Sequence, residues 1–267
     1  MTPRENTIDF WHQALHDLGT WKRASQRAVH KPLLTLMLLA RAQRGEPRRI
    51  PYQEIHKPLA DALRSFGPPR KSHHPEYPFW YLRNDGFWHV LEADQLPRRN
   101  GKDQPTANIL LSHEAVGEVP EGPWQLLTGS PELIVTIAQI LLDSFWPDTM
   151  HEDIVDQLGI SMVTMTRKRD PRFREEVLTA YERQCDICGF DGRLRDNLFG
   201  IEAAHIHFKQ DNGPDVVQNG LALCALHHKA FDRGAIGLSP HLHVVVSQDL
   251  VGHEMVKEFL VRFNGQE

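Results

Sequence analysis

The sequence predicts an α+β protein of two domains, the first mostly helical and the second built around short strands. Three observations support that prediction. The chain of 267 residues is long enough for two domains. All six tryptophans lie at or before Trp146, whereas all three cysteines lie at or after Cys185. Helical periodicity prevails up to residue 158, and strand-like segments separated by turns follow after residue 197.

Composition is that of an ordinary globular protein, with 40% hydrophobic and 24% charged residues. The longest apolar run, 32–40, is too short to span a bilayer, and the N-terminus lacks the apolar core of a signal peptide. Three cysteines in a CxxC…CxxH pattern favour metal binding in a reducing compartment over disulfides. We therefore expect a cytoplasmic protein.

The net charge of −5 does not by itself indicate a nucleic-acid partner. Phosphate contacts depend on cations clustered on one face, however, and net charge does not report on that. Each basic cluster of this chain is a candidate DNA contact, and each could equally be a solvated surface. The clusters are Arg48-Arg49, Arg70-Lys71, Arg98-Arg99 with Lys102, and Arg167-Lys168-Arg169.

Apolar residues recur at helical spacing in five segments of the first domain. These segments are 8–21, 30–45, 51–66, 131–146 and 151–158. Pro32 and Pro131 suit a first helical turn, and Gly45 suits a helix stop. Pro58 predicts an interruption or restart within the third segment. The apolar density of 33–40 predicts a helix that is buried nearly all round.

An aromatic-rich stretch follows the third of these helices. Four prolines between residues 68 and 78 predict an irregular loop. Residues 79–82 and 87–91 then predict two short strands, joined by Asn84-Asp85-Gly86 in a hairpin turn. Most of the aromatic side chains are expected in the core of this hairpin. The basic and aromatic loop before it is a candidate recognition surface.

The second domain is expected to follow a linker over 159–170, a Thr- and Met-rich and then basic stretch that we expect against the DNA backbone. The predicted domains are therefore 1–158 and 171–267. The elements expected in the second are helix 172–183, strand 198–208, a turn into a second strand from Asn219, helix 225–231, hairpin 236–247 and helix 254–263.

Two short motifs predict a metal site in the second domain. Cys185 and Cys188 form a CxxC, and Cys224 and His227 form a CxxH. Three thiolates and one imidazole are the ligand set of a closed, tetrahedral structural zinc site. We therefore expect Zn²⁺ at these four residues.

The sequence around these motifs resembles a known family. The order AAHI, NGLALC and HHKAFDRG is similar to that of HNH endonucleases, in the branch that carries a zinc knuckle beneath a ββα-metal motif. The resemblance implies an endodeoxyribonuclease in which His205 is the general base, Asn219 orients the site, and His228 binds a catalytic divalent ion, Mg²⁺ or Mn²⁺. A neutral imidazole suits deprotonation of water, and a cation suits the charge that develops on the phosphate.

One position departs from that pattern. Many HNH enzymes place an acidic or histidine metal ligand immediately before the catalytic histidine, where this chain has Ala204. Glu202 lies nearby on the predicted strand, and Asp232 follows His228 by one helical turn. Asp232 is the candidate second metal ligand, or alternatively a contact at the helix end. The ion is thus expected on His228 with Asp232, waters and phosphate oxygens.

A second resemblance covers about residues 1–158. HKPLL, followed by HHPEYPFWYLRNDGFW, is similar to the sulfur-binding domain of phosphorothioate-dependent restriction endonucleases. A phosphorothioate sulfur is larger, more polarizable and less hydrated than the oxygen it replaces, so a proline ring and aromatic faces would prefer it. The resemblance implies His30 and Lys31 on the phosphate charge; in place of Tyr81 the family often has a small residue. The implied DNA- and sulfur-binding residues are His30, Lys31, Tyr77, Pro78, Tyr81, Arg70, Lys71, His73 and His74.

Together the resemblances imply a type IV, modification-dependent restriction endonuclease: an N-terminal reader of phosphorothioate-modified double-stranded DNA and a C-terminal HNH nuclease. A homodimer is a further hypothesis, because double-strand cleavage usually needs two active sites. Two alternatives remain open, namely an HNH endonuclease dependent on methylated cytosine and a non-catalytic zinc-containing DNA-binding protein. Readers of base modifications usually enclose a flipped base. The Pro-rich aromatic loop beside HKP fits a mark on the DNA backbone better than a modified base. The intact HNH histidines and asparagine favour catalysis.

Overall fold

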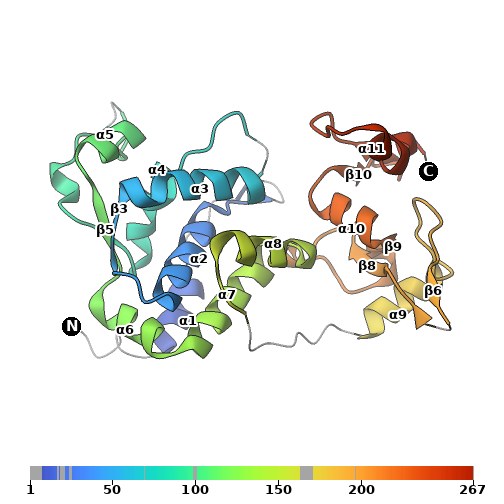
Figure 1. Cartoon of the computed structure of the whole chain (residues 1–267), viewed down its shortest axis with the longest axis horizontal. Coiled ribbons are helices and arrows are strands. Elements are labelled where there is room, and N and C mark those ends of the chain that lie inside the picture. The colour runs from blue at the N-terminus through green and yellow to red at the C-terminus, as the bar shows by residue number, and fades with distance from the viewer. Residues whose placement is uncertain are drawn as a thin grey trace. The chain divides into compact units, whose positions relative to one another are not determined.

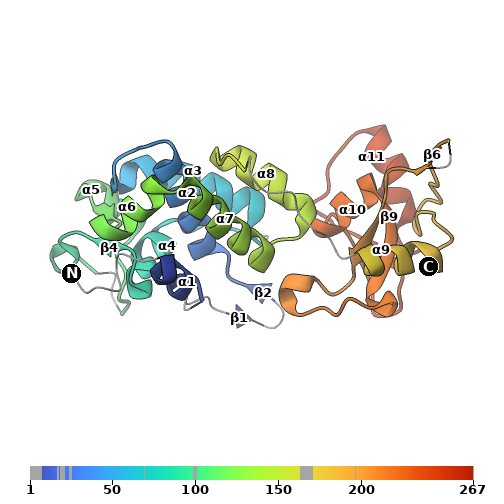
Figure 2. The ribbon, with the colours of Figure 1, turned by 90° about the horizontal axis from the view of Figure 1, so that it is seen from below.

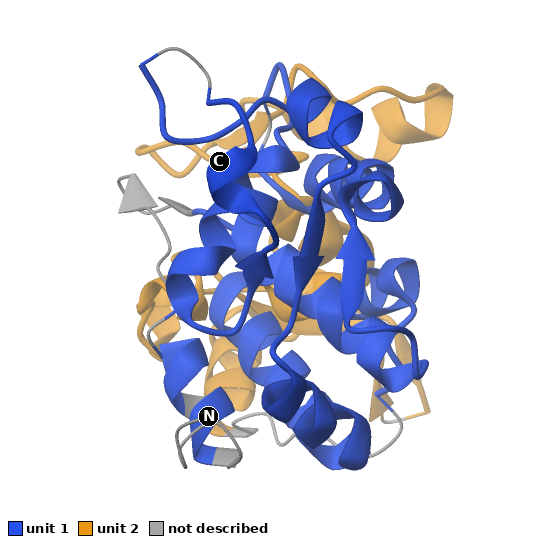
Figure 3. Ribbon diagram, turned by 90° about the vertical axis from the view of Figure 1, so that its left-hand side faces the viewer, with its two compact units in different colours: residues 1–146, 151–165 blue, residues 147–150, 166–267 orange. Residues whose placement is uncertain are grey.

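The computed structural model divides into two compact units, residues 1–146 with 151–165 and residues 147–150 with 166–267 (Figure 3). It describes residues 8–16, 18, 22–23, 26–68, 70–98, 101–162, 171–195 and 197–266. The predicted α+β class is confirmed. Most of the predicted linker lies outside the described residues, and the domain boundaries at 158 and 171 stay predictions.

Helices make up most of the first unit (Figure 1). A small antiparallel sheet, in the order β3-β5-β4, lies beside them. The elements are α1 (Ile8–His16), β1 (Lys22–Arg23), β2 (Gln26–Arg27), α2 (His30–Gln43), β3 (Arg49–Pro51), α3 (Tyr52–Phe66), α4 (Glu76–Tyr81), η2 (Leu82–Asp85), β4 (His89–Val90), η3 (Ala93–Gln95), α5 (Ala107–Ser112), β5 (Val116–Glu118), α6 (Glu121–Gly129), α7 (Pro131–Phe145) and α8 (Asp148–Leu158), of which residues 148–150 group with the second unit.

The core of the first unit surrounds α2, which is buried almost all round as its apolar density predicts. Helices α3, α4, α6 and α7 pack against it, and α7 runs beside it in both Figure 1 and Figure 2. Three buried indoles each donate their N–H to a backbone carbonyl, and two of these bonds join segments that are distant in sequence. Trp11 bonds to Pro123 O at 3.2 Å, Trp88 to Phe79 O at 2.8 Å, and Trp146 to Phe66 O at 2.9 Å.

The predicted hairpin over 79–91 is wrong. Residues 76–81 form α4 and 82–85 a 3-10 turn, while only His89–Val90 is a strand, paired with β5. Phe79 and Trp80 are both fully buried, which an alternating strand does not allow. Of the three turn residues only Gly86 has a positive φ, 82°, whereas a tight hairpin turn of type I′ needs two such residues in succession.

Two other helices differ from their predictions. Helix α3 runs unbroken through Pro58, because that residue is on the exposed side, where solvent can hydrate the carbonyl that loses its partner. Helix α1 ends at His16, and residues 17 and 19–21 of the predicted segment are not among those described. Within the described residues, no single helix is long and apolar enough to cross a membrane; α6 and α7 reach that length only jointly, across a bend of 102°.

The second unit is a β-hairpin enclosed by helices. Strands β8 and β9 pair antiparallel with Ile201 opposite Cys224 and His205 opposite Gly220, and both α9 and α10 pack against them. The elements are α9 (Pro171–Ala180), β6 (Arg193–Leu194), β7 (Asn197–Leu198), β8 (Ile201–His205), η4 (Lys209–Asp211), η5 (Val217–Asn219), β9 (Gly220–Cys224), α10 (Ala225–Asp232), β10 (Ile236–Leu238), β11 (Val244–Val246), α11 (Glu254–Phe259) and η6 (Val261–Phe263).

The order strand, strand, helix agrees with the prediction, and so does the closing hairpin of β10 and β11. Close packing of α9 on the hairpin depends on Gly220, since a Cβ there would lie 2.3 Å from a methyl carbon of Val177. That close approach brings the N-terminal half of α9 over the end of β8, where His205 lies.

Candidate functional site

The structure brings together the three cysteines and His227 of the CxxC and CxxH motifs. One ligand atom from each lies within 4.8 Å of all the others. The Sγ atoms of Cys188 and Cys224 are 3.9 Å apart, and Nδ1 of His227 is 3.5 Å from Cys185 Sγ and 3.1 Å from Cys224 Sγ. Tetrahedral ligands at Zn–S bonds of about 2.3 Å are separated by about 3.8 Å. The cluster is therefore close to the dimensions of such a site.

The surroundings prepare His227 and the thiols for a cation. His227 Nε2 donates to the carbonyl of Phe259 at 2.9 Å, which leaves Nδ1 with its lone pair toward the sulfurs. A hydrogen bond from Cys224 lowers the pKa of Cys185 to about 3, whereas the pKa of Cys224 is raised by its bond to Cys185 and that of Cys188 by burial. These shifts favour a thiolate at Cys185 and thiols at the other two cysteines, and a divalent cation would favour the thiolate form of all three.

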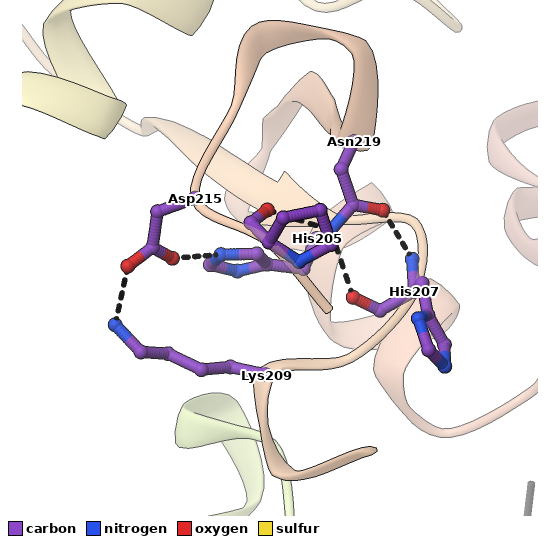
Figure 4. A network of polar contacts seen from close by, with 6 residues as sticks. His205, His207, Lys209, Asp215 and Asn219 are labelled. Atoms are coloured by element: carbon purple, nitrogen blue, oxygen red, sulfur yellow. Dashed lines mark hydrogen bonds and ion pairs between the residues drawn. The ribbon is translucent and has the colours of Figure 1, made fainter. Parts of the chain in front are cut away.

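His205, at the end of β8, is held on two sides, and Figure 4 shows its contact with Asp215. Its ring stacks on Phe173 of α9, with ring centroids 4.2 Å apart and an angle of 17°. Its Nε2 lies 2.8 Å from Oδ1 of Asp215, whose other oxygen accepts from Lys209 Nζ at 2.7 Å. That lysine holds the pKa of Asp215 below its usual value, so Asp215 is an ionised acceptor. His205 Nε2 therefore carries the proton, and in the neutral ring Nδ1 is the basic nitrogen.

Asn219 is buried, with 8% of its surface exposed, and it braces the loop between β8 and β9 (Figure 4). Its Oδ1 accepts from the backbone N–H of His207 at 2.8 Å, and its Nδ2 donates to the carbonyls of His207 and Pro214, both at 3.0 Å. The backbone N–H of Ile206 also donates to the Asn219 carbonyl at 2.9 Å. Asn219 therefore fixes the backbone directly after His205.

His228 of α10 lies between two carboxylates. Its Nδ1 is 2.7 Å from Oε2 of Glu202 on β8, and its Nε2 is 3.4 Å from Oδ2 of Asp232 one helical turn on. Asp232 also accepts from the hydroxyl of Thr149, a residue of the same unit. Burial raises the pKa of Asp232 above its usual value, and its side chain is only 3% exposed.

The residues implied in sulfur binding lie on α2, on α4 and on the irregular segment before α4 in the first unit. His30 is the first residue of α2, and burial, followed by the positive charge of Arg70, lowers its pKa to about 4. Lys31 Nζ forms a 2.6 Å ion pair with Asp85, whose side chain is 4% exposed. The imidazole of His30 is thus neutral near pH 7, and the charge of Lys31 is paired with a carboxylate. That these two residues meet a phosphate charge stays a prediction.

Tyr77, Pro78 and Tyr81 all lie on α4, whereas the sequence predicted a loop for the first two and a strand for the third. Pro78 is buried, and Tyr77 stacks on His74 with ring centroids 4.7 Å apart. Burial, and then the nearby Asp103 carboxylate, raise the pKa of Tyr81. Its hydroxyl therefore stays protonated and donates to Gln104 Oε1 at 2.6 Å.

The remaining implied residues belong to the irregular segment before α4. Arg70 and Lys71 are exposed. His73 is half-buried, and with Arg70 and His74 it acts electrostatically on His30. His74 is fixed by Ser72 and by Glu76, at 3.0 and 2.9 Å.

Sequence reasoning missed the partners that orient these residues. Asp215, Lys209 and Phe173 around His205 belong to no motif that the sequence analysis used, and neither does Gln104 in the first unit. Asp85 was predicted only as a turn residue, and its ion pair with Lys31 was missed. Only its position indicated Asp215 in advance. It lies between His205 and Asn219 in the sequence, so its carboxylate stays close to His205 in any conformation of the loop.

The ββα arrangement of β8, β9 and α10, with His205 and His228 on it, places the second unit in the class of HNH domains. An HNH endonuclease family model matches residues 185–239. The first unit identifies the family: the chain belongs to the ScoMcrA-like DNA sulfur-binding domain family, whose model matches residues 9–163. Both resemblances found in the sequence are confirmed.

Several solved structures are similar to this chain. The sulfur-binding domain of ScoMcrA in complex with phosphorothioated DNA is 24% identical, with a TM-score of 0.51 over 56% of this chain and 94% of that chain, and so shares the fold. The sulfur-binding domain of SprMcrA with phosphorothioated DNA is 20% identical (TM-score 0.48, 60% of this chain, 98% of that chain). The type IV phosphorothioation-dependent restriction endonuclease ScoMcrA is 23% identical (TM-score 0.49, 60% and 31%). No curated protein matched the chain significantly.

Proposed function

We propose that this protein is a type IV restriction endonuclease that recognises phosphorothioate-modified DNA with residues 1–158 and hydrolyses DNA with the HNH site of residues 171–267. One observation carries the proposal: a chain of the sulfur-binding family also holds, in its HNH domain, a histidine whose Nε2 contacts the Asp215 carboxylate and whose following backbone is held by Asn219. A domain kept only as a scaffold has no need of that arrangement.

Recognition begins at the junction of α2 and α4. The proposed sulfur pocket is made of uncharged groups, namely neutral His30, the Pro78 ring and the Tyr77 face, which suit a poorly hydrated sulfur better than an oxygen. Lys31 is bound to Asp85, and so its role is to hold the start of α2 against η2. Exposed Arg70 and Lys71 then supply the contacts to phosphate charge.

Tyr81 completes the wall of the pocket in this proposal. The family often has a small residue there, but the Tyr81 hydroxyl is turned to Gln104, and its ring lies edge-on to Tyr77 at 6.4 Å between centroids. The ring is therefore held in place as an apolar surface. His73 and His74 support the same surface, His74 by stacking on Tyr77.

Cleavage is assigned to the second unit. His205 accepts a proton from the attacking water at Nδ1, because Asp215 keeps the other ring nitrogen protonated. The ionised Asp215 also stabilises the imidazolium that results. Phe173 limits rotation of the ring, and Asn219 keeps the following backbone in place, so the base needs little reorganisation before reaction.

Two metal ions of different roles are included in the proposal. Cys185, Cys188, Cys224 and His227 hold a structural Zn²⁺ that joins the start of α10 to the knuckle after α9. His228, with neighbouring carboxylates, holds the catalytic divalent ion, Mg²⁺ or Mn²⁺. When bound, that ion supplies positive charge to the scissile phosphate and the leaving oxygen.

The two-domain arrangement gives selectivity for modified DNA even though the nuclease domain does not recognise a base sequence. Binding of the mark raises the local concentration of the nuclease domain on that DNA. Cutting both strands needs two active sites, and a homodimer on DNA is part of the proposal.

The test uses paired DNA duplexes of one sequence, with and without a single stereodefined phosphorothioate, incubated with the full chain and Mg²⁺ or Mn²⁺. Binding and cleavage are measured on the same samples, and His205→Ala is the matched variant. Selective binding and cutting of the sulfur-bearing duplex is expected, with His205→Ala binding but not cutting. Light scattering of the bound complex reports whether two chains are present.

Each other outcome rejects part of the proposal. Equal binding and cleavage of the duplexes with and without sulfur would refute sulfur recognition and direct the search to methylated cytosine. Cleavage by His205→Ala at the wild-type rate would refute the assigned base. Selective binding with no cleavage by the wild-type protein in either metal would favour a non-catalytic DNA-binding protein.

A further inference from the structure

The ligand set of the catalytic ion differs in this chain from the pattern of many HNH enzymes, because Ala204 stands immediately before His205. The Ala204 side is also closed, since this residue is fully buried opposite Leu221 of β9. Successive side chains of a strand alternate between its faces, so Glu202 lies on the same face of β8 as Ala204. Its carboxylate reaches His228 on α10.

The two carboxylates around His228 cannot both bind an ion that the imidazole binds. Glu202 faces Nδ1 and Asp232 faces Nε2, and the lone pairs of these two ring nitrogens point away from one another. An ion on Nδ1 would have Glu202 beside it and Asp232 on the far side of the ring. An ion on Nε2 would have Asp232 beside it and Glu202 on the far side of the ring.

We propose that the catalytic divalent ion is bound by Glu202 and Nδ1 of His228, and that Asp232 is a positioning residue that accepts the Nε2 proton of His228. This inference rests on the proposed function, since it names the ligands of the ion that the nuclease uses. It replaces the sequence-based assignment of Asp232 as a ligand. Glu202 then supplies the ligand that many HNH enzymes have at the position of Ala204. It lies two residues earlier on β8 and on the same face of the strand.

The distance between the two ligand atoms fits this arrangement. Adjacent ligands of an octahedral ion with bonds of about 2.1 Å lie about 3.0 Å apart. Glu202 Oε2 and His228 Nδ1 are 2.7 Å apart, a distance at which a proton on Nδ1 is donated to the carboxylate. An ion bound at Nδ1 takes the place of that proton, the neutral ring then carries its proton on Nε2 toward Asp232, and the two ligand atoms move apart by a few tenths of an ångström. Carboxylates are ligands of both Mg²⁺ and Mn²⁺. The imidazole nitrogen favours Mn²⁺, which is the softer of the two ions.

Exposure distinguishes the two carboxylates. The Glu202 side chain is 34% exposed, whereas that of Asp232 is 3% exposed. A catalytic ion must be reached by a DNA phosphate and must keep waters in its coordination shell. Among the described residues, the Glu202 side of His228 is the more exposed of the two. Asp232 instead has the environment of a carboxylate that orients a metal-bound histidine from behind.

Mn²⁺ binding to the full-length protein tests the proposal without DNA or cleavage. Free Mn²⁺ is measured by electron paramagnetic resonance in zinc-loaded protein, for wild type, Glu202→Gln, Asp232→Asn and His228→Ala. The matched control is Glu254→Gln, which removes a carboxylate that is 90% exposed on α11. Zinc content and the unfolding midpoint confirm that each variant is folded.

Glu202→Gln and His228→Ala are expected to weaken Mn²⁺ binding by about 100-fold or more, since each removes a direct ligand. Asp232→Asn should weaken it by about tenfold, because the amide oxygen can still accept from Nε2. Glu254→Gln should have no effect. Normal Mn²⁺ binding by Glu202→Gln together with loss in Asp232→Asn would overturn this assignment but leave the proposed nuclease intact. Equal binding by wild type and His228→Ala would reject the metal site of the proposed function itself.

Discussion

Replacing Asn219 by alanine is expected to damage both the second unit and its catalytic loop. The side chain is 8% exposed and makes three hydrogen bonds to the backbone of His207 and Pro214, at 2.8, 3.0 and 3.0 Å. A buried hydrogen bond contributes about 1 kcal/mol net. Asn219→Ala should therefore lower the free energy of unfolding by about 3 kcal/mol. For a unit of roughly 100 residues, that lowers the unfolding midpoint by about 12 °C or more.

The arrangement of tryptophans provides an internal control for this experiment. All six lie at or before Trp146, so their fluorescence reports on the first unit alone. Urea unfolding followed by fluorescence should be unchanged in Asn219→Ala, while the transition followed by zinc release should move to lower urea. Asn197→Ala, at an exposed position on β7, is the matched control and should alter neither transition.

Asn219→Asp separates hydrogen bonding from side-chain volume. The carboxylate can still accept from the His207 N–H, but it cannot donate to the two carbonyls, so an intermediate loss of stability is expected. Both variants should bind phosphorothioate DNA normally and cut it at least about 100-fold more slowly, because the backbone after His205 is no longer held. A zinc-release transition within 0.5 kcal/mol of wild type (roughly the scatter of surface substitutions) in Asn219→Ala would refute this reasoning.

Three other substitutions or conditions are expected to have specific effects. Asp215→Asn should slow single-turnover cleavage by about 100-fold with unchanged DNA binding, because an amide can donate to His205 Nε2 and select the wrong tautomer; cleavage within twofold of wild type would contradict this. Atomic absorption should find one zinc ion per chain in the purified protein. Cys188→Ser should lose both the metal and the unfolding transition of the second unit, while tryptophan fluorescence should still report a folded first unit. Acid should destabilise the first unit through His30, whose pKa burial lowers from 6.5 to about 4. The unfolded chain then binds the proton more tightly than the folded chain. The free energy of unfolding is therefore highest above pH 6.5 and decreases by about 3 kcal/mol as the pH falls from there through 4. His30→Gln should flatten this pH dependence in urea unfolding followed by fluorescence, and an unchanged pH dependence would contradict the burial of the imidazole.

Elements whose pattern is local were predictable from the sequence. Helices α2 and α7 follow from uninterrupted apolar spacing with a proline near the start. The order β8, β9, α10 follows from two apolar strands and a helix that begins directly after Cys224. In each case the residues that specify the element are also the residues within it.

The stretch over 76–91 was not predictable in the same way. Its aromatic residues and Asn84-Asp85-Gly86 favour a hairpin locally, but Phe79 and Trp80 are both needed in the core around α2. A helix can direct two consecutive side chains toward one core, whereas a strand directs them to opposite faces. Tertiary burial therefore overrode the local turn signal.

The sequence by itself determined the chemistry that this protein carries: three sulfurs and an imidazole at metal-ligand spacing, and histidines and an asparagine in the order of an HNH site. Tertiary structure decided how those groups are used. Asp215 selects the basic nitrogen of His205, Asp85 neutralises Lys31, and exposure separates Glu202 from Asp232 at His228. Protonation, charge pairing and access to solvent depend on neighbours brought together by packing, so they follow from the fold and not from a motif.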